Sequence, residues 1–283
     1  MKVNTKPETG YLELIYFFIP KEEFSTELIK IYRVINSQEI RYVLHEYTLY
    51  ILLYIDESDP FYFFSLQVLT HKINEENKST NIGYAPSLSL IGDLYIAAIG
   101  GLNSDTVNLF DLETGEWIYV GKMQSTRYGA YSLYDEENKV IYICGGKDNE
   151  HQDNSLEIEY FSIRNIGNGN KFEIKTIELE MEFSLRRSFP VSFQCHDSST
   201  FIVCGGYGLI DEDTSTTTFV FISKAICELQ TDLHKEFSSK NPNIAISSKF
   251  VYFFYNDTEV IKFDASLIKF TSIQKVDNEE EKK

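Results

Sequence analysis

Short apolar runs, separated by polar turns, follow one another along almost the whole chain of 283 residues. Between the glycine pairs at 100–101 and 145–146 there are four such runs, bounded by turn-forming clusters such as 113–115 and 135–138. The runs are too short for the sustained 3.6-residue period of an amphipathic helix. Short strands at regular spacing are typical of an all-β array. The pattern therefore predicts an all-β protein built from four-stranded units.

A pair of glycines ends three of the apolar runs and marks a repeat. Successive pairs are 45 and 60 residues apart in the sequence. The pairs are Gly100-Gly101, Gly145-Gly146 and Gly205-Gly206. A mark that recurs at such a period indicates an array of supersecondary units rather than one irregular domain.

The residues that follow the first glycine pair resemble the kelch repeat. The pattern is a glycine pair, an aromatic-Asp turn, a Trp, and then Met and Arg before the next strand. The matching residues are Gly100, Gly101, Phe110, Asp111, Trp117, Met123 and Arg127. The second unit keeps Gly145, Gly146, Tyr160 and Arg186 or Arg187, and the third keeps Gly205 and Gly206. The resemblance covers roughly residues 90–210 and implies a β-propeller of four-stranded blades.

The flanking regions show the same rhythm without the glycines. Aligning the strands before the glycine pairs with the runs at 11–18, 47–55 and 249–255 predicts six repeats. The blades would end near residues 44, 75, 122, 180, 232 and 276, and further strands are expected at 28–35 and 39–44. We predict one kelch-like propeller over 1–276, with two degenerate first blades and a charged tail over 277–283. Six blades is the natural count, and five or seven remain alternatives.

Charge and composition narrow the classes of partner. The formal net charge is −17 and the sequence pI is near 4.7, without the basic footprint of nucleic-acid binders. The apolar run at 47–69 contains three acidic residues and a proline, so we expect no membrane insertion. Cys144 and Cys204 both precede a glycine pair directly, and buried free thiols fit a reducing compartment. With no signal-peptide core, a cytoplasmic or cytoskeletal location is expected.

The sequence contains no recognisable catalytic chemistry. The five histidines lack metal-ligand spacing, and common nucleophile and phosphate-loop motifs are not found. We therefore expect no metal, no cofactor and no catalytic residue. The predicted function is a non-catalytic protein–protein interaction module, acting as an adaptor or as a structural subunit of a larger assembly. The alternative is a small-molecule enzyme of the kelch type that uses the central mouth of the propeller.

Candidate partner-binding residues cluster at one predicted edge of the blades. In a four-stranded antiparallel blade, the loop between strands two and three shares an edge with the loop entering the next blade. Arg127, Tyr128, Arg186 and Arg187 all lie where such entering loops meet a first strand. The resemblance implies that these arginines bind acidic segments of other proteins at the propeller mouth. The alternative is that they tie neighbouring blades together through backbone carbonyls. Trp117 and Tyr128 are expected to pack between blades rather than to bind a ligand.

Overall fold

The part of the chain that the structure describes is nearly all β and forms antiparallel sheets. The computed structural model describes residues 2–6, 11–18, 23–30, 39–54, 61–70, 72–76, 82–147, 158–165, 174–177, 191–194, 200–204, 217–221, 225–228, 244–247, 250–254, 259–264 and 269–274. They belong to two compact units. The first unit combines Met1–Asn36 with Pro242–Lys283, and the second is Ser37–Asn241. The predicted all-β class is confirmed.

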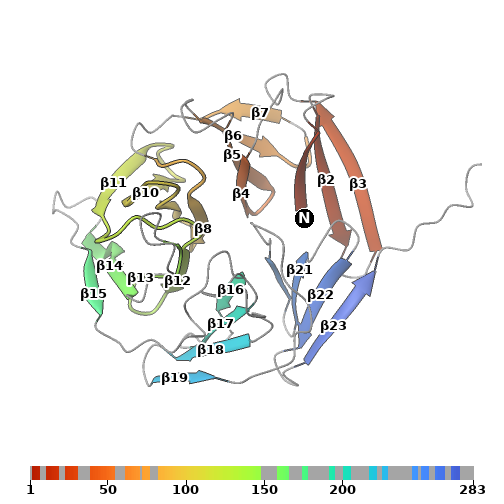
Figure 1. Cartoon of the computed structure of the whole chain (residues 1–283). Coiled ribbons are helices and arrows are strands. Elements are labelled where there is room, and N and C mark those ends of the chain that lie inside the picture. The colour runs from red at the N-terminus through yellow and green to blue at the C-terminus, as the bar shows by residue number, and fades with distance from the viewer. Residues whose placement is uncertain are drawn as a thin grey trace, which may run out of the picture. The chain divides into compact units, whose positions relative to one another are not determined.

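The second unit holds four sheets of four strands each (Figure 1). We call them sheets II to V, and in each the strands lie side by side in chain order. Sheet II contains β4 (Glu39–His45), β5 (Thr48–Tyr54), β6 (Tyr62–Gln67) and β7 (Lys72–Glu75). Sheet III contains β8 (Ser87–Ile91), β9 (Tyr95–Ile99), β10 (Thr106–Asp111) and β11 (Trp117–Lys122). Sheet IV contains β12 (Tyr131–Asp135), β13 (Val140–Cys144), β14 (Ile158–Ser162) and β15 (Lys175–Ile177), with a 3-10 turn at Ile163–Asn165. Sheet V contains β16 (Val191–Gln194), β17 (Thr200–Cys204), β18 (Thr217–Phe221) and β19 (Ala225–Glu228).

The first unit holds two further antiparallel sheets. Sheet I has three strands, β1 (Lys2–Lys6), β2 (Tyr11–Phe18) and β3 (Glu23–Lys30). Sheet VI has four strands, β20 (Ile244–Ser247), β21 (Phe250–Phe254), β22 (Glu259–Asp264) and β23 (Lys269–Gln274).

Successive sheets of the second unit meet through their first strands. Strand β4 contacts β8, β8 contacts β12, and β12 contacts β16. Figure 1 labels these strands and shows the later strands of each sheet following in order. Four-stranded meanders packed in sequence in this way are what propeller blades are made of, so the arrangement is consistent with a propeller-like fold.

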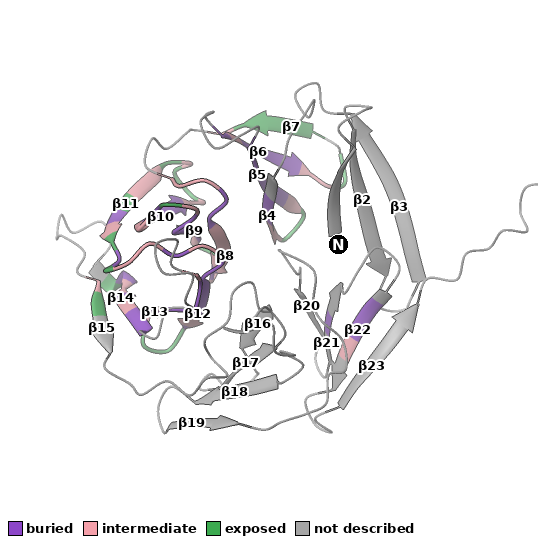
Figure 2. Ribbon diagram, viewed as in Figure 1, coloured by how far each residue is buried: buried purple, intermediate pink, exposed green. Residues whose placement is uncertain are grey.

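Sheet III is buried on both faces, which explains why its central strands are apolar at nearly every position (Figure 2). Neighbouring side chains of a strand point to opposite faces. One face packs against sheet IV in a cluster that includes Ala97, Ile99, Val107 and Leu109 with Ile141, Ile143 and Phe161. The other packs against sheet II in a cluster that includes Ile96 and Phe110 with Leu52, Tyr54 and Phe63. Burying both faces of a sheet removes the polar alternation of a half-exposed strand.

The sequence located the second strand of every sheet correctly. The three glycine-pair strands are β9, β13 and β17, and the three aligned runs are β2, β5 and β21, each second in its sheet. The expectation that 39–44 closes the first blade was wrong, because this segment is β4, the first strand of sheet II. The two-residue turn at Glu46-Tyr47 joins β4 directly to β5, and so short a loop forces antiparallel pairing of the two. The strand expected at 28–35 overlaps β3 (Glu23–Lys30) only at 28–30, and 31–35 lie outside the described residues.

Trp117 joins two sheets through aromatic contacts. It begins the last strand of sheet III, and its ring lies 5.1 Å from the ring of Phe63 in sheet II. Phe110, on the neighbouring strand, completes the group at 5.3 Å from Trp117 and 4.8 Å from Phe63. Trp117 therefore lies between neighbouring sheets, and its partner sheet is the preceding one.

We expect Trp117→Ala to destabilise the protein by about 3 kcal/mol. This value lies at the lower end of the range of destabilisation measured when a large aromatic side chain is removed from a core, because the Trp117 side chain is only partly buried. Thermal unfolding followed by circular dichroism measures the change. Tyr119→Ala, on the same strand and 46% exposed, serves as the control and should change stability little. Equal melting temperatures for the wild type and Trp117→Ala would show that the aromatic group does not hold the two sheets together.

Candidate functional site

The loops at one edge of sheets III and IV are bound to each other by their backbones. The loop that leaves sheet III and enters β12 lies against the loop between β9 and β10. Gly101 N–H donates to Arg127 O at 2.9 Å, Arg127 N–H to Ser104 O at 3.2 Å, and Met123 N–H to Asp105 O at 2.7 Å. The two kinds of loop thus share an edge here, as the sequence predicted. We call the loops 83–86, 100–105, 123–130 and 145–147 the loop face.

The glycine pairs are required by this close contact. Gly100, Gly101 and Gly146 all have positive φ, at 63°, 122° and 86°. A Cβ on Gly100 would lie 2.3 Å from Arg127 O, and a Cβ on Gly101 would lie 2.5 Å from Tyr84 O. Both distances are far inside van der Waals contact, so the entering loop can approach only where there is no side chain. Each described glycine pair is therefore the place where the loop after a second strand crosses a loop that enters a first strand.

A second repeated feature lies beside each described pair. Tyr84 and Tyr128 each stand three residues before a first strand, and each forms an isolated antiparallel bridge. Tyr84 bridges to Leu102, and Tyr128 bridges to Lys147; these partners directly follow a glycine pair. In the second bridge both N–H groups donate, at 2.9 and 2.8 Å. Tyr128 is thus placed by its backbone, and its side chain is partly exposed on the loop face.

Sheet II replaces the glycine pair with a buried tyrosine. Counted from the start of the second strand, Tyr54 stands where the second glycine, Gly101, stands in sheet III; it is 2% exposed and donates its hydroxyl to Gly83 O at 3.0 Å. Burial raises the pKa of Tyr54, so the hydroxyl stays a donor. The degenerate blade of the sequence thus uses a side chain to contact the next entering loop, where the later repeats use backbone.

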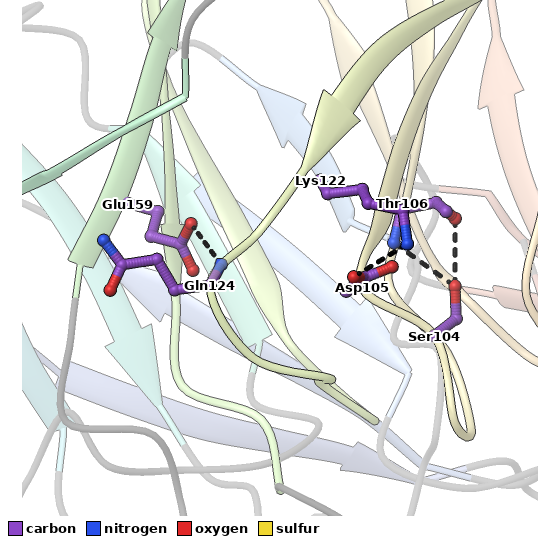
Figure 3. Close-up of polar contacts among 6 residues, drawn as sticks. All are labelled: Ser104, Asp105, Thr106, Lys122, Gln124 and Glu159. Carbon is purple, nitrogen blue, oxygen red and sulfur yellow. Dashed lines mark hydrogen bonds and ion pairs between the residues drawn. The ribbon is translucent and has the colours of Figure 1, made fainter.

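Arg127 forms a buried ion pair with Glu159. Its side chain is 0% exposed, and Nη2 lies 2.7 Å from Glu159 Oε1, whose side chain is 1% exposed. Nη1 donates to Gly145 O at 3.5 Å. The other oxygen of Glu159 accepts from the backbone N–H of Gln124 at 3.0 Å (Figure 3). The Arg127 backbone contacts sheet III while its guanidinium contacts sheet IV, so this residue ties the two sheets together.

The remaining polar contacts of this region lie nearer solvent. Figure 3 shows Lys122 Nζ reaching Asp105 Oδ2 at 3.1 Å, and the hydroxyls of Ser104 and Thr106 at 2.9 Å from each other. The Lys122 side chain is 64% exposed, so this ion pair contributes at most about 1 kcal/mol. These contacts shape the loop after β9 rather than form a reactive group.

Cys144 lies directly before the second glycine pair and is buried. Burial raises the pKa of its thiol to about 12, although nearby Arg127 acts in the opposite direction. A thiol with this pKa is protonated at neutral pH and is a poor nucleophile. Among the residues whose structure is described, no group of three or more His, Cys, Asp or Glu side chains is placed to hold a metal ion.

We expect Cys144 to resist alkylation in the folded protein. The thiol should remain unmodified by iodoacetamide at pH 8 and react fully once the chain is unfolded in guanidinium chloride. Peptide mass spectrometry reads the modification at Cys144 separately from that at the other three cysteines. Rapid labelling of Cys144 under native conditions would mean that the thiol is accessible and ionised.

The structure brings together part of the predicted site. Arg127 and Tyr128 lie on one loop, which contacts the loops that carry the glycine pairs 100–101 and 145–146, whereas Trp117 lies apart between sheets II and III. Arg186, Arg187, Gly205 and Gly206 lie outside the described residues. The geometry of Arg127 favours the alternative in which the arginine joins blades. Glu159 was not among the predicted site residues. The feature that distinguishes it in the sequence is a charge two positions before the buried Phe161, which places both side chains on the same face of β14.

No protein-family model and no curated protein sequence matches this chain. Within the described part of the chain, no helix is long and apolar enough to span a bilayer.

Proposed function

We propose that the protein is a non-catalytic interaction module, an adaptor or a structural subunit of a larger assembly, with a kelch-like propeller as its scaffold. The observation that carries this proposal is the use of the buried polar groups at the loop face. Arg127, Glu159 and the thiol of Cys144 are buried, and the two charges are paired with each other. Buried and paired groups of this kind stabilise the packing of the sheets and are not accessible to a substrate. The exposed surface is therefore the part of the molecule that is available for binding.

The loop face also supports a specific division of roles. Tyr128 and Lys147 lie partly exposed on it, joined by a backbone bridge that fixes their spacing. We propose that Arg186 and Arg187 supply positive groups that pair with acidic segments of a partner. Bidentate pairing with carboxylates is a property of arginine that lysine does not share.

Affinity purification of the tagged full chain after mild cross-linking tests the proposed function. We expect the same partner proteins to be recovered in repeated experiments, at amounts comparable to the chain itself. Arg186→Ala/Arg187→Ala tests the two proposed arginines, with Lys175→Ala, an exposed basic residue on β15, as the control. Recovery of the chain alone, with turnover of a small molecule by the purified protein, would overturn the proposal in favour of the enzyme alternative.

A further inference from the structure

The edge of sheets II, III and IV opposite the loop face is built from equivalent turns. In each sheet the turn between strands three and four donates a backbone hydrogen bond to the turn between strands one and two. The bonds are Val68 N–H to Tyr47 O at 2.8 Å, Leu112 N–H to Leu94 O at 3.0 Å, and Ile163 N–H to Lys139 O at 2.9 Å. We call the turns 46–47, 68–70, 92–94, 112–116, 136–139 and 163–164 the turn face.

The turns of the three sheets are neighbours in space. His45 Nε2, at the end of β4, lies 3.4 Å from Asp93 Oδ1 in the next sheet. A Cβ on Gly92 would lie 3.5 Å from the ring of Tyr134, near the end of β12. The turn face is therefore one continuous surface across sheets II to IV rather than three separate tips.

Large apolar side chains stand exposed on this surface. Tyr47 is 62% exposed, Leu69 is 71% exposed and Leu94 is 51% exposed. Two of them, Tyr47 and Leu94, occupy the same position in consecutive sheets, directly before the second strand. Single exposed apolar residues need no explanation, whereas several on one face offer apolar area that a partner could cover.

The same surface is strongly acidic. It carries six exposed carboxylates: Glu46, Asp93, Glu113, Glu116, Glu136 and Glu137. It carries two basic residues, Lys139 and Arg164, and the Arg164 guanidinium donates to Glu137 O at 3.3 Å. On the described loop face, by contrast, the one carboxylate, Asp105, is balanced by Lys147, because Arg127 is buried and paired with Glu159. Most of the exposed carboxylates described in sheets II to IV therefore lie at the turn face.

We propose that the turn face is a docking surface for a basic segment of a partner protein, in which apolar side chains alternate with Lys or Arg. The apolar side chains pack on Tyr47, Leu69 and Leu94, and the basic ones lie against the surrounding carboxylates. Burial of the apolar anchors supplies affinity, and the carboxylates supply orientation and a faster encounter. This inference rests on the proposed function in so far as it takes the partner to be a protein.

Fluorescence anisotropy with three labelled synthetic peptides tests the surface directly. One alternates Lys with Leu, one alternates Lys with Ser, and one alternates Glu with Leu. We expect the Lys/Leu peptide to bind most tightly, to weaken as salt is raised, and to bind about tenfold more weakly to Tyr47→Ser/Leu94→Ser. Tyr119→Ser replaces a comparably exposed tyrosine on strand β11 and should leave binding unchanged.

A second variant keeps the test independent of the apolar pair. Glu46→Gln/Glu113→Gln/Glu136→Gln preserves side-chain size and should weaken the Lys/Leu peptide and flatten its salt dependence. Equal binding of the Lys/Ser and Lys/Leu peptides to wild type and both variants overturns the proposal, and so does preferred binding of the Glu/Leu peptide. A change of oligomeric state in Tyr47→Ser/Leu94→Ser also overturns it, because the occupant would then be a second copy.

The two proposals can fail separately. If cross-linking recovers the same partners with wild type and with both turn-face variants, the protein is an interaction module that uses another surface. If no protein partner is recovered with the wild type, the proposed function itself fails, whatever the peptides do.

Discussion

Arg127→Ala should destabilise the protein by about 3–5 kcal/mol, a larger loss than we expect for Trp117→Ala. The change leaves the Glu159 carboxylate, which is 1% exposed, without its cationic partner. It also removes the donor to Gly145 O. A loss of this size is a large fraction of the total stability of a typical domain. Urea unfolding followed by circular dichroism and tryptophan fluorescence measures it.

Two variants separate the charge effect from simple loss of packing. Arg127→Met/Glu159→Gln removes both charges and keeps an amide oxygen for the Gln124 N–H, so it should recover part of the stability lost in Arg127→Ala. Arg164→Ala, which removes an exposed side chain that donates to Glu137 O, should stay within about 0.5 kcal/mol of wild type. Wild-type stability in Arg127→Ala would mean that the ion pair does not hold sheets III and IV together.

The same variants decide what Arg127 does for binding. Because its guanidinium is fully buried, any loss of partners in Arg127→Ala should follow the loss of folded protein. Partner recovery should then increase with Arg127→Met/Glu159→Gln, which lacks the arginine but recovers part of the lost stability. Partners lost in this double variant at wild-type stability would assign the arginine a direct role in recognition.

The fold was readable from the sequence because each repeat shows a local physical requirement. Gly100 and Gly101 reveal a crossing of two loops, and the apolar run before them reveals a strand buried on both faces. The predicted blade boundary at residue 44 was wrong because the sequence around 39–45 contains no glycine pair or other feature that identifies a first strand. Its placement depends on a two-residue turn at Glu46-Tyr47, where a non-glycine residue takes a φ of 52°. Glutamate in this conformation gives no turn signal in the sequence.

The candidate site was readable only in part, because its chemistry depends on contacts between distant residues. Arg127 was found by its place in the repeat, but its partner Glu159 is 32 positions away and on another strand. The sequence therefore left two roles open for Arg127, binding a partner or joining neighbouring blades. The burial of both Arg127 and Glu159 favours the joining of blades. The acidic, apolar turn face escaped notice because each turn, taken alone, looks like an ordinary solvated loop. Only the stacking of sheets II to IV brings Tyr47 and Leu94 onto one surface.

Gly101→Ala is the second change with a large expected effect, roughly 4 kcal/mol. The residue has a φ of 122°, a conformation that is nearly exclusive to glycine, and strain of this kind costs about 1–3 kcal/mol. The new Cβ would also lie 2.5 Å from Tyr84 O and 3.1 Å from the Gly83 carbonyl carbon. These are backbone atoms, which cannot rotate away as a flexible side chain can, and such overpacking adds about 1–3 kcal/mol.

Gly115→Ala is the matched control for this variant. Gly115 also has a positive φ, 70°, but nothing lies within 4 Å of where its Cβ would stand. Its replacement should therefore show the backbone cost alone, about 1–2 kcal/mol. The difference between the two variants in urea unfolding measures the close crossing of the loops, and it should exceed the experimental error several-fold. If Gly101→Ala loses no more stability than Gly115→Ala, the glycine pair is kept only for its conformation, and the loop that enters β8 does not press against it.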